Sequence, residues 1–392
     1  MSRWHSYLNS AKEILLLYKG EEPFASFSKK YFSGHKKFGA SDRRQVSHLC
    51  YSYFRTGKAL QDRSMEERIL AGVFLCAEGP DKFLEELRPA WNEKTGLTIV
   101  EKIAFLGAEL FTLELFPWTN ELSDGIDKEK FVLSHLQQPD LFLRLRPGKE
   151  ALVMEKLATA GIGFKIISEQ CLALPNASRI DTLVELDKEA VVQDRSSQYV
   201  GTFLNQKPKT KNHKLSVWDC CAASGGKSIM AKDILGEIEL TVSDVRESIL
   251  ANLKKRFGVA GITDYKALVT DLAKENIQYS MLNDQFSLIL ADLPCTGSGT
   301  WSRTPEQLFY FEYEKIKSYV TLQQKILSNV LNYLEPGGYL LYITCSVFKK
   351  ENEEVVEFIK EKFRLEEVKT EWIKGYDKKA DTMFAALLRK PL

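Results

Sequence analysis

Hydrophobic residues recur at helical spacing along the first third of the chain. From residue 9 to about residue 124, apolar side chains return every three or four positions, as at Val46, Leu49 and Tyr53. This spacing places the apolar side chains along one face of each helix. The pattern therefore predicts an all-helical domain of five or six helices within residues 1–130.

A shorter segment of mixed character follows. Two prolines flank an alternating apolar sequence at residues 141–145, which is typical of a strand. A helical pattern over residues 150–160, a turn with two glycines and a second apolar run over residues 164–167 come next. Together these features predict a small α+β module over residues 131–200.

Beyond a lysine-rich linker at residues 205–216, short apolar strands alternate with helices. The strands are predicted at residues 215–219, 238–243, 265–270, 286–292 and 339–344, and the helices at residues 226–235, 247–257, 313–334 and 351–363, with two further strands closing the chain. This alternation predicts a parallel, doubly wound α/β sheet over residues 201–392. Ligands of such sheets bind beyond the carboxyl ends of the strands, so the residues that follow each strand are the candidate site residues.

The overall charge excludes one simple argument for nucleic acid. The 392 residues include 54 Lys and Arg against 53 Asp and Glu, which gives a formal charge of +1. The charges are unevenly distributed, however, because residues 1–60 carry eleven cations and four acids, while residues 61–140 carry eight cations and sixteen acids. We expect the basic N-terminal segment to attract a polyanion, and the lysines at residues 207–214 to contribute phosphate contacts.

The cysteines and the apolar runs indicate the environment of the protein. An odd number of cysteines, seven, argues against a disulfide framework. The chain has five histidines and no Cys-x-x-Cys pair, so we expect no metal site. No apolar run reaches the roughly 18 residues that a membrane span requires. We therefore expect a cytoplasmic protein that is not bound to a membrane, and we expect it to be a monomer.

The first predicted strand ends in a turn of small residues, DCCAASGGKS at residues 219–228. Such a turn lets the backbone approach a ligand closely, and the N-terminus of the following helix offers N–H groups to an anion. A phosphate-binding P-loop would need glycine at Cys221, and the dinucleotide pattern G-x-G-x-x-G is absent. The remaining common ligand is S-adenosylmethionine, whose carboxylate suits a helix N-terminus. The alternative is that the turn is only a tight connection between strand and helix and binds no ligand.

Acidic residues and cysteines follow the other predicted strands. Asp244 comes at the end of the second strand, where a carboxylate suits ribose hydroxyls, and Asp271 follows the third. Either acid could instead cap a helix. Asp292 and Cys295 follow the fourth strand, and Cys345 follows the fifth. Both cysteines follow the carboxyl ends of strands, where ligands bind. Cysteines at this position indicate a role in chemistry, whereas cysteines in a core would indicate packing.

Two thiols and a carboxyl group suit methylation of a cytosine at C5. This carbon becomes nucleophilic only when a thiolate adds to C6, and a carboxylic acid that donates to N3 assists the addition. The C5 proton must then be removed and the thiolate expelled. An amine methyltransferase would need an Asp/Asn-Pro-Pro-aromatic turn, and the sequence DLPC at residues 292–295 lacks the aromatic residue. The residues thus favour methylation of carbon.

Three motifs resemble the Fmu/Sun family of RNA 5-methylcytosine methyltransferases: DCCAASGGK at residues 219–227, DLPCTGSG at 292–299 and PGGYLLYITCSV at 336–347. Further matches lie at residues 192–198 (VQDRSSQ), 303–306 (RTPE), 322–327 (LQQKIL), 351–353 (ENE) and 384–390 (FAALLRK). Residues 40–46 and 49–55 are similar, more weakly, to an antitermination-factor-like RNA-binding domain. The resemblance implies a Rossmann-like class I methyltransferase domain with a mixed seven-stranded sheet, preceded by an all-α domain and a small α+β RNA-binding module.

The resemblance also implies a role for each site residue. Cys345 is the implied nucleophile at C6, Cys295 assists product release, and Asp292 protonates N3. The residues implied to hold the cofactor, S-adenosylmethionine, are Cys221, Ala222, Ala223, Ser224, Gly225, Gly226, Lys227, Asp244, Arg246, Asp271 and Asp292. The residues expected to contact RNA, with ribosomal RNA the expected substrate, are Arg303, Lys29, Lys30, Lys36, Lys37, Arg43 and Arg44.

The chain departs from the family pattern at three places. Ser224 stands where the family has proline, which we expect to loosen the turn. Cys220 replaces an aliphatic residue, and we expect it to fill the core. The usual Asp-Gly-Phe-Phe near the end becomes DTMF at residues 381–384, on the expected substrate side.

Three other functions are alternatives. A DNA cytosine methyltransferase would use the Pro-Cys thiol, Cys295, as its nucleophile. An RNA-binding assembly factor would keep the cofactor fold without turnover. A P-loop NTPase is disfavoured by Cys221. The first two stay open at this point.

Overall fold

The computed structural model describes residues 2–206, 214–274 and 285–392. It contains two compact units, which are described one at a time. The first comprises Met1–Leu122, Asp127–Gln138 and Thr300–Tyr313, and the second comprises Ser123–Ile126, Pro139–Gly299 and Glu314–Leu392. This division differs from the three consecutive domains expected from the sequence, because the α+β module shares a unit with the large sheet. The predicted linker and its lysines lie mostly outside the described residues.

The first unit is helical. Its elements are α1 (Arg3–Leu17), α2 (Phe24–Gly34), α3 (Ala40–Arg55), α4 (Met65–Cys76), α5 (Lys82–Leu87), α6 (Pro89–Asn92), α7 (Ile99–Phe105), α8 (Phe111–Leu115), η1 (Thr119–Glu121), α9 (Lys128–Ser134) and α14 (Pro305–Tyr310). The expected five or six helices were too few, because the short helices give almost no periodicity to detect. Local caps start them instead, such as the capping boxes at Ser64 and Thr98.

Two buried polar side chains hold distant segments of this unit together. The Arg55 guanidinium at the end of α3 donates to the carbonyl oxygens of His135, at 2.6 Å, and Gln137, at 3.1 Å. The Glu306 carboxylate on α14 accepts a hydrogen bond from the Phe24 backbone N–H. These bonds satisfy backbone groups at helix ends, and they explain why residues 300–313 belong to the helical unit.

The second unit contains a small antiparallel sheet and a larger mixed sheet. The small sheet has the order β2-β3-β1-β4 and consists of β1 (Leu141–Leu145), β2 (Lys165–Ser168), β3 (Cys171–Leu174) and β4 (Ala190–Val192), with α10 (Glu150–Thr159) packed on it. The large sheet has the order β10-β11-β9-β8-β5-β6-β7 and consists of β5 (Leu215–Asp219), β6 (Ile238–Asp244), β7 (Lys266–Val269), β8 (Phe286–Asp292), β9 (Leu334–Thr344), β10 (Glu366–Ile373) and β11 (Met383–Arg389). In the large sheet β11 alone is antiparallel to its neighbours, so the sheet is mixed and seven-stranded, as the resemblance implied.

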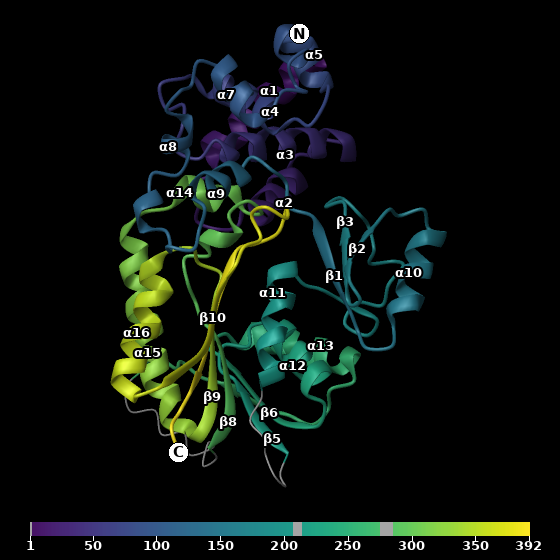
Figure 1. Cartoon of the computed structure of the whole chain (residues 1–392). Coiled ribbons are helices and arrows are strands. Elements are labelled where there is room, and N and C mark those ends of the chain that lie inside the picture. The colour runs from purple at the N-terminus through teal and green to yellow at the C-terminus, as the bar shows by residue number, and fades with distance from the viewer. Residues whose placement is uncertain (1, 207–213, 275–284) are drawn as a thin grey trace. The chain divides into compact units, whose positions relative to one another are not determined.

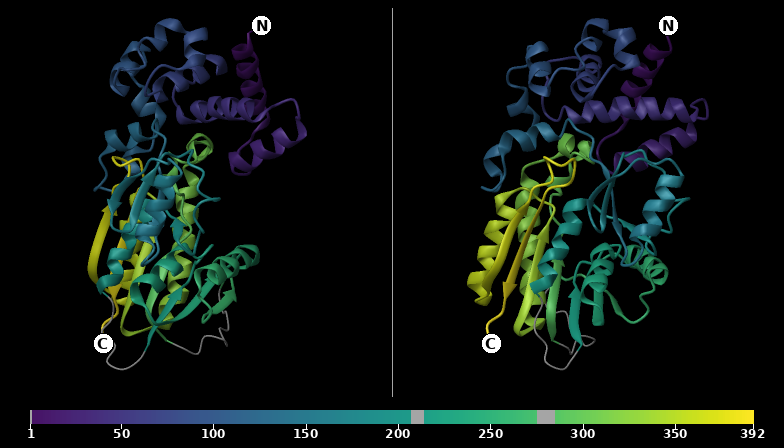
Figure 2. Two further views of the ribbon diagram at one scale, coloured as in Figure 1. Left: turned by 90° about the vertical axis from the view of Figure 1, so that its right-hand side faces the viewer. Right: turned by 45° about the vertical axis from the view of Figure 1, so that its right-hand side comes forward.

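Helices cover both faces of the large sheet (Figures 1 and 2). The helical elements of this unit are α11 (Arg195–Tyr199), η2 (Val200–Gln206), α12 (Gly226–Leu235), α13 (Glu247–Ala260), η3 (Ser298–Thr300), α15 (Glu314–Val330), η4 (Leu331–Tyr333), η5 (Lys349–Glu351) and α16 (Glu353–Phe363). One core cluster packs α12 and α13 against the sheet, and a second packs α15 and α16 against the other face. The doubly wound arrangement predicted from the sequence is therefore confirmed.

One predicted boundary was wrong. The helix expected over residues 313–334 ends at Val330, and β9 already begins at Leu334, before the Pro-Gly-Gly sequence at residues 336–338. The pairing of β9 with β8 slips at this point, and Gly337 has a φ of +78°, which favours glycine. The sequence expected to end the helix thus forms an irregularity inside a strand.

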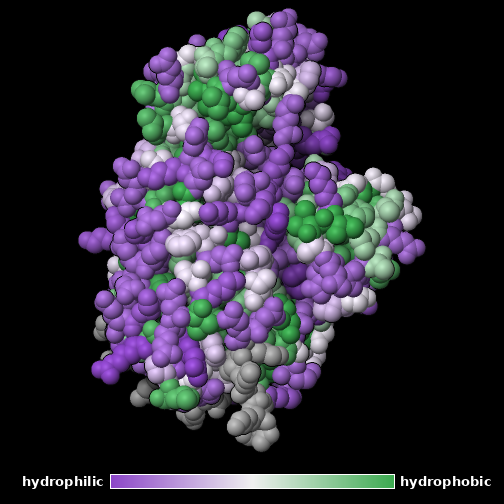
Figure 3. Space-filling model, in the orientation of Figure 1, coloured by the Kyte–Doolittle hydropathy of each residue, from purple (hydrophilic) through white to green (hydrophobic). Residues whose placement is uncertain are grey.

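Polar and charged side chains cover most of the face seen in Figure 3, and apolar ones appear there in scattered groups. Among the described residues, no helix is long and apolar enough to cross a membrane.

Candidate active site

The carboxyl ends of five parallel strands converge at one edge of the large sheet. Because β9, β8, β5, β6 and β7 are neighbours in that order, the segments that follow β8 and β9 lie beside the turn that follows β5. The sheet therefore brings Cys295, Cys345 and the turn at residues 219–226 to the same edge, as predicted.

The two cysteines form a close pair. Their Sγ atoms lie 3.4 Å apart, and both side chains are half-buried. The hydrogen bond to Cys345, together with burial, raises the pKa of the Cys295 thiol well above its ordinary value. Gly299 permits this approach, because its N–H donates to the Cys345 carbonyl oxygen at 2.8 Å and an added Cβ would lie 1.9 Å from the Thr382 carbonyl oxygen. The two thiols are thus held in direct contact, and one of them donates to the other.

A buried carboxyl group supports both cysteine segments. Glu351 accepts hydrogen bonds from the Thr296 N–H at 2.9 Å and the Thr296 hydroxyl at 2.6 Å, next to Cys295. It also accepts one from the Ser346 hydroxyl at 2.5 Å, next to Cys345, and one from Gln323 at 3.3 Å. Burial raises the pKa of Glu351. One side chain therefore fixes the positions of both thiols.

Lys227 joins the small-residue turn to Asp292. Its Nζ lies 2.7 Å from Asp292 Oδ2, and both side chains are largely buried. Burial acts to lower the pKa of Lys227, but Asp292, and to a lesser degree Cys345 and Asp219, raise it overall. A cation is therefore held within electrostatic reach of Cys345 and in contact with Asp292.

The turn at residues 219–226 has the backbone geometry that its small residues permit. Gly225 is the N-cap of α12 with a φ of +84°, and an added Cβ would lie 2.7 Å from Phe257. Ala223 also has a positive φ, of 45°. Asp219 Oδ2 accepts a hydrogen bond from the Ser228 hydroxyl at 2.5 Å, whereas its buried Oδ1 has no partner among the described residues. The turn thus exposes a helix N-terminus next to an unpaired carboxylate oxygen.

Asp219 gives the protein a pH dependence of stability. Burial raises the pKa of its carboxyl group to about 7, from an ordinary value of 3.8. Between these values the folded state binds a proton that the unfolded state has released, so stability is lost as the pH rises through the window. Asp219→Asn keeps the acceptor for Ser228, and we expect it to remove this loss, gaining up to about 4 kcal/mol on the wild type between about pH 4 and pH 7.

Urea unfolding of both proteins at a series of pH values measures this difference. Asp264→Asn, which neutralises an exposed carboxylate on the same unit, is the control. A difference between wild type and Asp219→Asn that stays constant with pH would contradict the proton-binding state of Asp219.

Arg256 holds Ser224 through two hydrogen bonds. Arg256 Nη1 donates to both the carbonyl oxygen and the hydroxyl of Ser224, at 2.9 Å each. Asp187, from the α+β module, binds Arg256 through two bonds of 2.6 and 2.9 Å. The hydroxyl is an acceptor that proline lacks. The expectation that serine loosens the turn stays a prediction.

The acids after β6 and β7 make local bonds. Asp244 accepts from the Ala223 N–H at 3.1 Å and pairs with Arg246, whose Nε lies 3.0 Å from it. Asp271 accepts from the Ala273 N–H at 3.1 Å. The carboxylate of Asp244 thus lies directly beside the turn, whereas that of Asp271 caps its own segment.

The remaining predicted residues of the turn are placed as follows. Cys221, Ser224 and Gly226 are half-buried, and the N–H of the buried Ala222 donates to the Ser243 carbonyl oxygen at 2.9 Å. Cys220 is fully buried in the core beneath α15 and α16, as expected. No group of three or more His, Cys, Asp or Glu side chains in the described part of the chain could hold a metal ion.

The predicted RNA contacts lie in the first unit. The six exposed cations on α2, on α3 and between these helices are Lys29, Lys30, Lys36, Lys37, Arg43 and Arg44. Lys30 pairs with Glu22 at 2.7 Å, and Arg43 Nε donates to the Phe38 carbonyl oxygen. Arg303 is half-buried in the segment that includes α14. The structure thus gathers the six N-terminal cations on one helical hairpin.

The mixed sheet, the helices on both of its faces and the small-residue turn after β5 define a Rossmann-like methyltransferase fold. Residues 204–388 match the family described as 16S rRNA methyltransferase RsmB/F. The resemblance inferred from the motifs is thereby confirmed.

Individual relatives agree with this assignment. The chain is 29% identical over 239 residues to the probable ribosomal RNA small subunit methyltransferase B of Bacillus subtilis, covering 59% of this chain and 52% of that protein. The chain spans about half the length of the curated relatives it matches.

Two crystal structures share the fold. The structure of the protein PH0851 aligns over 99% of this chain and 98% of its own, with a TM-score of 0.71 and 21% identity. A methyltransferase homolog protein from Pyrococcus horikoshii aligns over 74% of this chain and 98% of its own, with a TM-score of 0.58 and 22% identity. At these identities the likeness shows the fold alone.

Sequence reasoning missed several supporting residues. Glu351 was noticed only as part of the motif ENE, although its position just after the Cys345 motif was a signal that it serves the same site. Nothing in the sequence connects Arg256 with Ser224 or Asp187, because the three residues come from separate elements that only the fold brings together.

Proposed function

We propose that the protein is an S-adenosylmethionine-dependent methyltransferase that acts on C5 of a cytosine in RNA. The observation that carries the proposal is the pair of thiols, 3.4 Å apart, at the ends of the adjacent strands β8 and β9 and beside Asp292. The names of the curated relatives favour small-subunit ribosomal RNA as the substrate. Two expectations from the sequence, a monomer and a cytoplasmic location, remain predictions.

The turn after β5 fits the cofactor. The N-terminus of α12 at Gly225 suits its carboxylate, and the unpaired Oδ1 of Asp219 suits its amino group. Asp244 would accept the ribose hydroxyl protons once Arg246, which is exposed, gives up its bonds. When bound, S-adenosylmethionine supplies an electrophilic methyl group. Asp271 remains the candidate for the adenine end, and Cys221 to Gly226 would line the turn.

The residues of the site suit a covalent route. The Cys345 thiolate adds to C6 of the cytosine, forming a C–S bond, while Asp292 and Lys227 supply a proton at N3. C5 then has enamine character and accepts the methyl group. Release requires transfer of the C5 proton to solvent water and cleavage of the bond between C6 and Cys345, with Cys295 donating a proton to the departing thiolate.

The choice of nucleophile separates this route from that of a DNA cytosine methyltransferase. The alternative needs Cys295 as the attacking thiolate, whereas the RNA route uses Cys345. The match of residues 204–388 to a family of ribosomal RNA methyltransferases favours the RNA enzyme.

The direct test is methyl transfer from labelled S-adenosylmethionine to small-subunit ribosomal RNA, with the product nucleoside identified by mass spectrometry. The proposal predicts 5-methylcytidine. Methylation of another nucleoside, or a preference for duplex DNA, would contradict it. Calorimetry with S-adenosylmethionine separates the remaining alternative, because an assembly factor with a dead cofactor fold would show no binding.

We also propose that the cations of the α2 and α3 hairpin bind RNA phosphates. Lys29, Lys36 and Lys37 are exposed, and none has an ion-pair or hydrogen-bond partner among the described residues. Changing all three to Gln is expected to weaken RNA binding and to reduce the slope of log affinity against log salt by about 2, since each phosphate contact contributes about 0.7. Filter binding across a range of salt concentrations measures the slope.

The matched control neutralises three exposed lysines on other elements of the same unit, Lys82, Lys94 and Lys128. We expect this variant to keep the wild-type slope. If both triple variants lowered the slope equally, the hairpin would have no specific role in RNA binding.

A further inference from the structure

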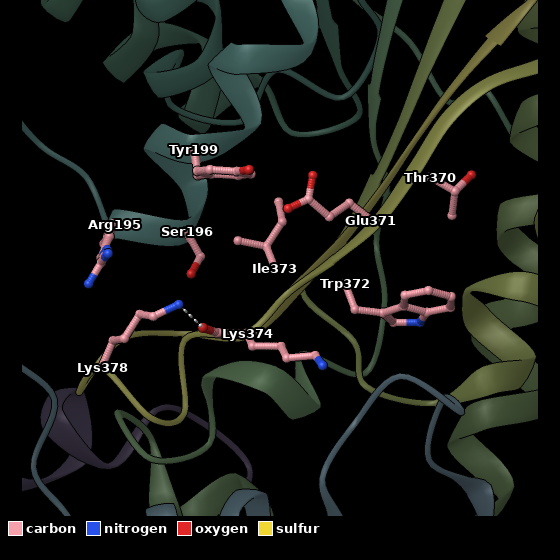
Figure 4. Close-up of a pocket in the computed structure, with 9 residues that line it drawn as sticks. All are labelled: Arg195, Ser196, Tyr199, Thr370, Glu371, Trp372, Ile373, Lys374 and Lys378. Carbon is pink, nitrogen blue, oxygen red and sulfur yellow. Dashed lines mark hydrogen bonds between the residues drawn. The ribbon is translucent and has the colours of Figure 1, made fainter. Parts of the chain in front are cut away.

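A pocket of about 460 Å³ lies between α11 and the end of β10 (Figure 4). Its lining residues are Arg195, Ser196 and Tyr199 from α11, Thr370, Glu371, Trp372 and Ile373 from β10, and Lys374 and Lys378 from the loop that follows. Arg195 belongs to the motif VQDRSSQ. The roles proposed for the cofactor turn and for the cysteine pair do not involve this motif. All of these residues belong to one compact unit.

The pocket carries an excess of positive charge. Arg195, Lys374 and Lys378 face a single acid, Glu371, which is already paired with Lys369 at 2.8 Å. The Arg195 guanidinium has no hydrogen-bond or ion-pair partner among the described residues. Lys378 Nζ donates to the Lys374 carbonyl oxygen at 3.3 Å, and its 3.8 Å contact with Asp377 is a weak exposed pair. The lining therefore favours an anion.

An aromatic ring stands beside these cations. Tyr199 is 41% exposed, and a hydrogen bond to Glu371 raises the pKa of its hydroxyl group. Ile373 lies across from the ring in Figure 4, whereas Trp372 points away and donates its indole N–H to Glu353. A flat aromatic ring next to cations suits a nucleotide, whose base can stack while its phosphate is bound.

Hydrogen bonds and a close backbone approach join the walls of the pocket. Asp194 caps α11 by accepting from the Ser196 N–H at 2.8 Å, and it also accepts from the Asp381 N–H at 3.1 Å. Gly375 allows the loop to close tightly, because an added Cβ would lie 1.8 Å from the Asp381 carbonyl oxygen. The Asp194 carboxylate thus ties α11 to the lysine-bearing loop.

The pocket lies on the same edge of the sheet as the cysteines. Because β11 is antiparallel to both β9 and β10, the strands β9 and β10 run in the same direction. Thr344, which precedes Cys345, pairs with Phe384, and Phe384 pairs with Trp372. Two strand spacings therefore separate the end of β9 from the pocket wall, a distance of about 10 Å. When the target cytosine is held at Cys345, a nearby nucleotide of the same RNA can span this distance and reach the pocket.

We propose that this pocket binds a nucleotide of the substrate RNA that flanks the target cytosine, with its base against Tyr199 and its phosphate between Arg195 and Lys378. The inference rests on the proposed function, and it names a subsite outside the cofactor turn and the cysteine pair. The pocket would fix which neighbour of the target is engaged.

The test uses the full chain and extracted small-subunit ribosomal RNA. Arg195→Ala combined with Lys378→Ala is compared with Lys254→Ala combined with Lys255→Ala, which removes two exposed cations from α13. We expect the pocket variant to bind RNA at least about tenfold more weakly and to lose about 1 to 2 units of salt slope. The α13 variant is expected to keep the wild-type affinity and slope.

Tyr199 supplies a second test. If the pocket bound RNA through charge alone, the RNA affinity would not depend on this ring. Tyr199→Ala is expected to weaken RNA binding by about tenfold, whereas Tyr199→Phe, which keeps the ring and loses the bond to Glu371, is expected to keep it. Should Tyr199→Ala fail to fold, Lys378→Ala alone still tests the pocket, because this side chain is exposed.

Unchanged RNA affinity in the pocket variant, or equal losses in the two double variants, would overturn the subsite. The chemistry is tested separately on the same RNA by methyl transfer. Methyl transfer by the wild type without any pocket effect rejects only the subsite, and a pocket effect without methyl transfer rejects only the proposed function.

Discussion

Cys345→Ala is expected to lower the rate of cytosine methylation by more than about a thousandfold, because no other group at the site can form the bond to C6. The neighbouring thiol, Cys295, follows β8 rather than β9, and the proposed route assigns it to product release. The affinity for S-adenosylmethionine should stay unchanged, because the turn after β5 is untouched. Single-turnover methylation with labelled cofactor, together with calorimetry, measures the two quantities.

Cys76→Ala is the matched control for loss of a cysteine, because Cys76 lies in the helical unit and is not placed at the site. This variant should methylate at the wild-type rate. Substantial turnover by Cys345→Ala would remove this cysteine from the reaction and with it the covalent route.

Cys295→Ala is expected to accumulate a covalent complex between the protein and RNA. Without the Cys295 thiol 3.4 Å from Cys345, the departing thiolate has no adjacent proton source, so cleavage of the bond to C6 becomes the slow step. We expect most of the variant to shift on a denaturing gel when RNA and cofactor are both present. The wild type should show at most a faint shifted band.

The double variant Cys295→Ala with Cys345→Ala is the control, and it should form no complex. If the adduct instead formed with Cys345→Ala and was lost with Cys295→Ala, the two thiols would have exchanged roles, as in the DNA alternative.

Much of the catalytic fold could be predicted from the sequence because its signals are local. The strands β5 and β8 and the helix α12 lie where the apolar runs predicted, and Gly225 has the positive φ that a sharp turn before a helix needs. The position of each site residue just after a strand then followed from the order of strands and helices.

The parts that could not be predicted depend on tertiary contacts. The bonds of Arg256 to Ser224 join residues 32 positions apart, and the bond of Glu351 to Thr296 joins residues 55 apart. Neither pair has a local pattern. The pocket at Tyr199 is harder still, because it arises where β10 meets α11 and no motif spans the two elements.

The central claim is that Cys345 forms the bond to C6 of a cytosine in RNA. RNA in which cytidine is replaced by 5-fluorocytidine tests it most directly, because fluorine at C5 cannot leave as a proton and the adduct persists after methyl transfer. Peptide mass spectrometry of the wild-type complex should find the nucleotide on Cys345, and only when S-adenosylmethionine is present. A nucleotide on Cys295, or no attached nucleotide at all, would contradict the account.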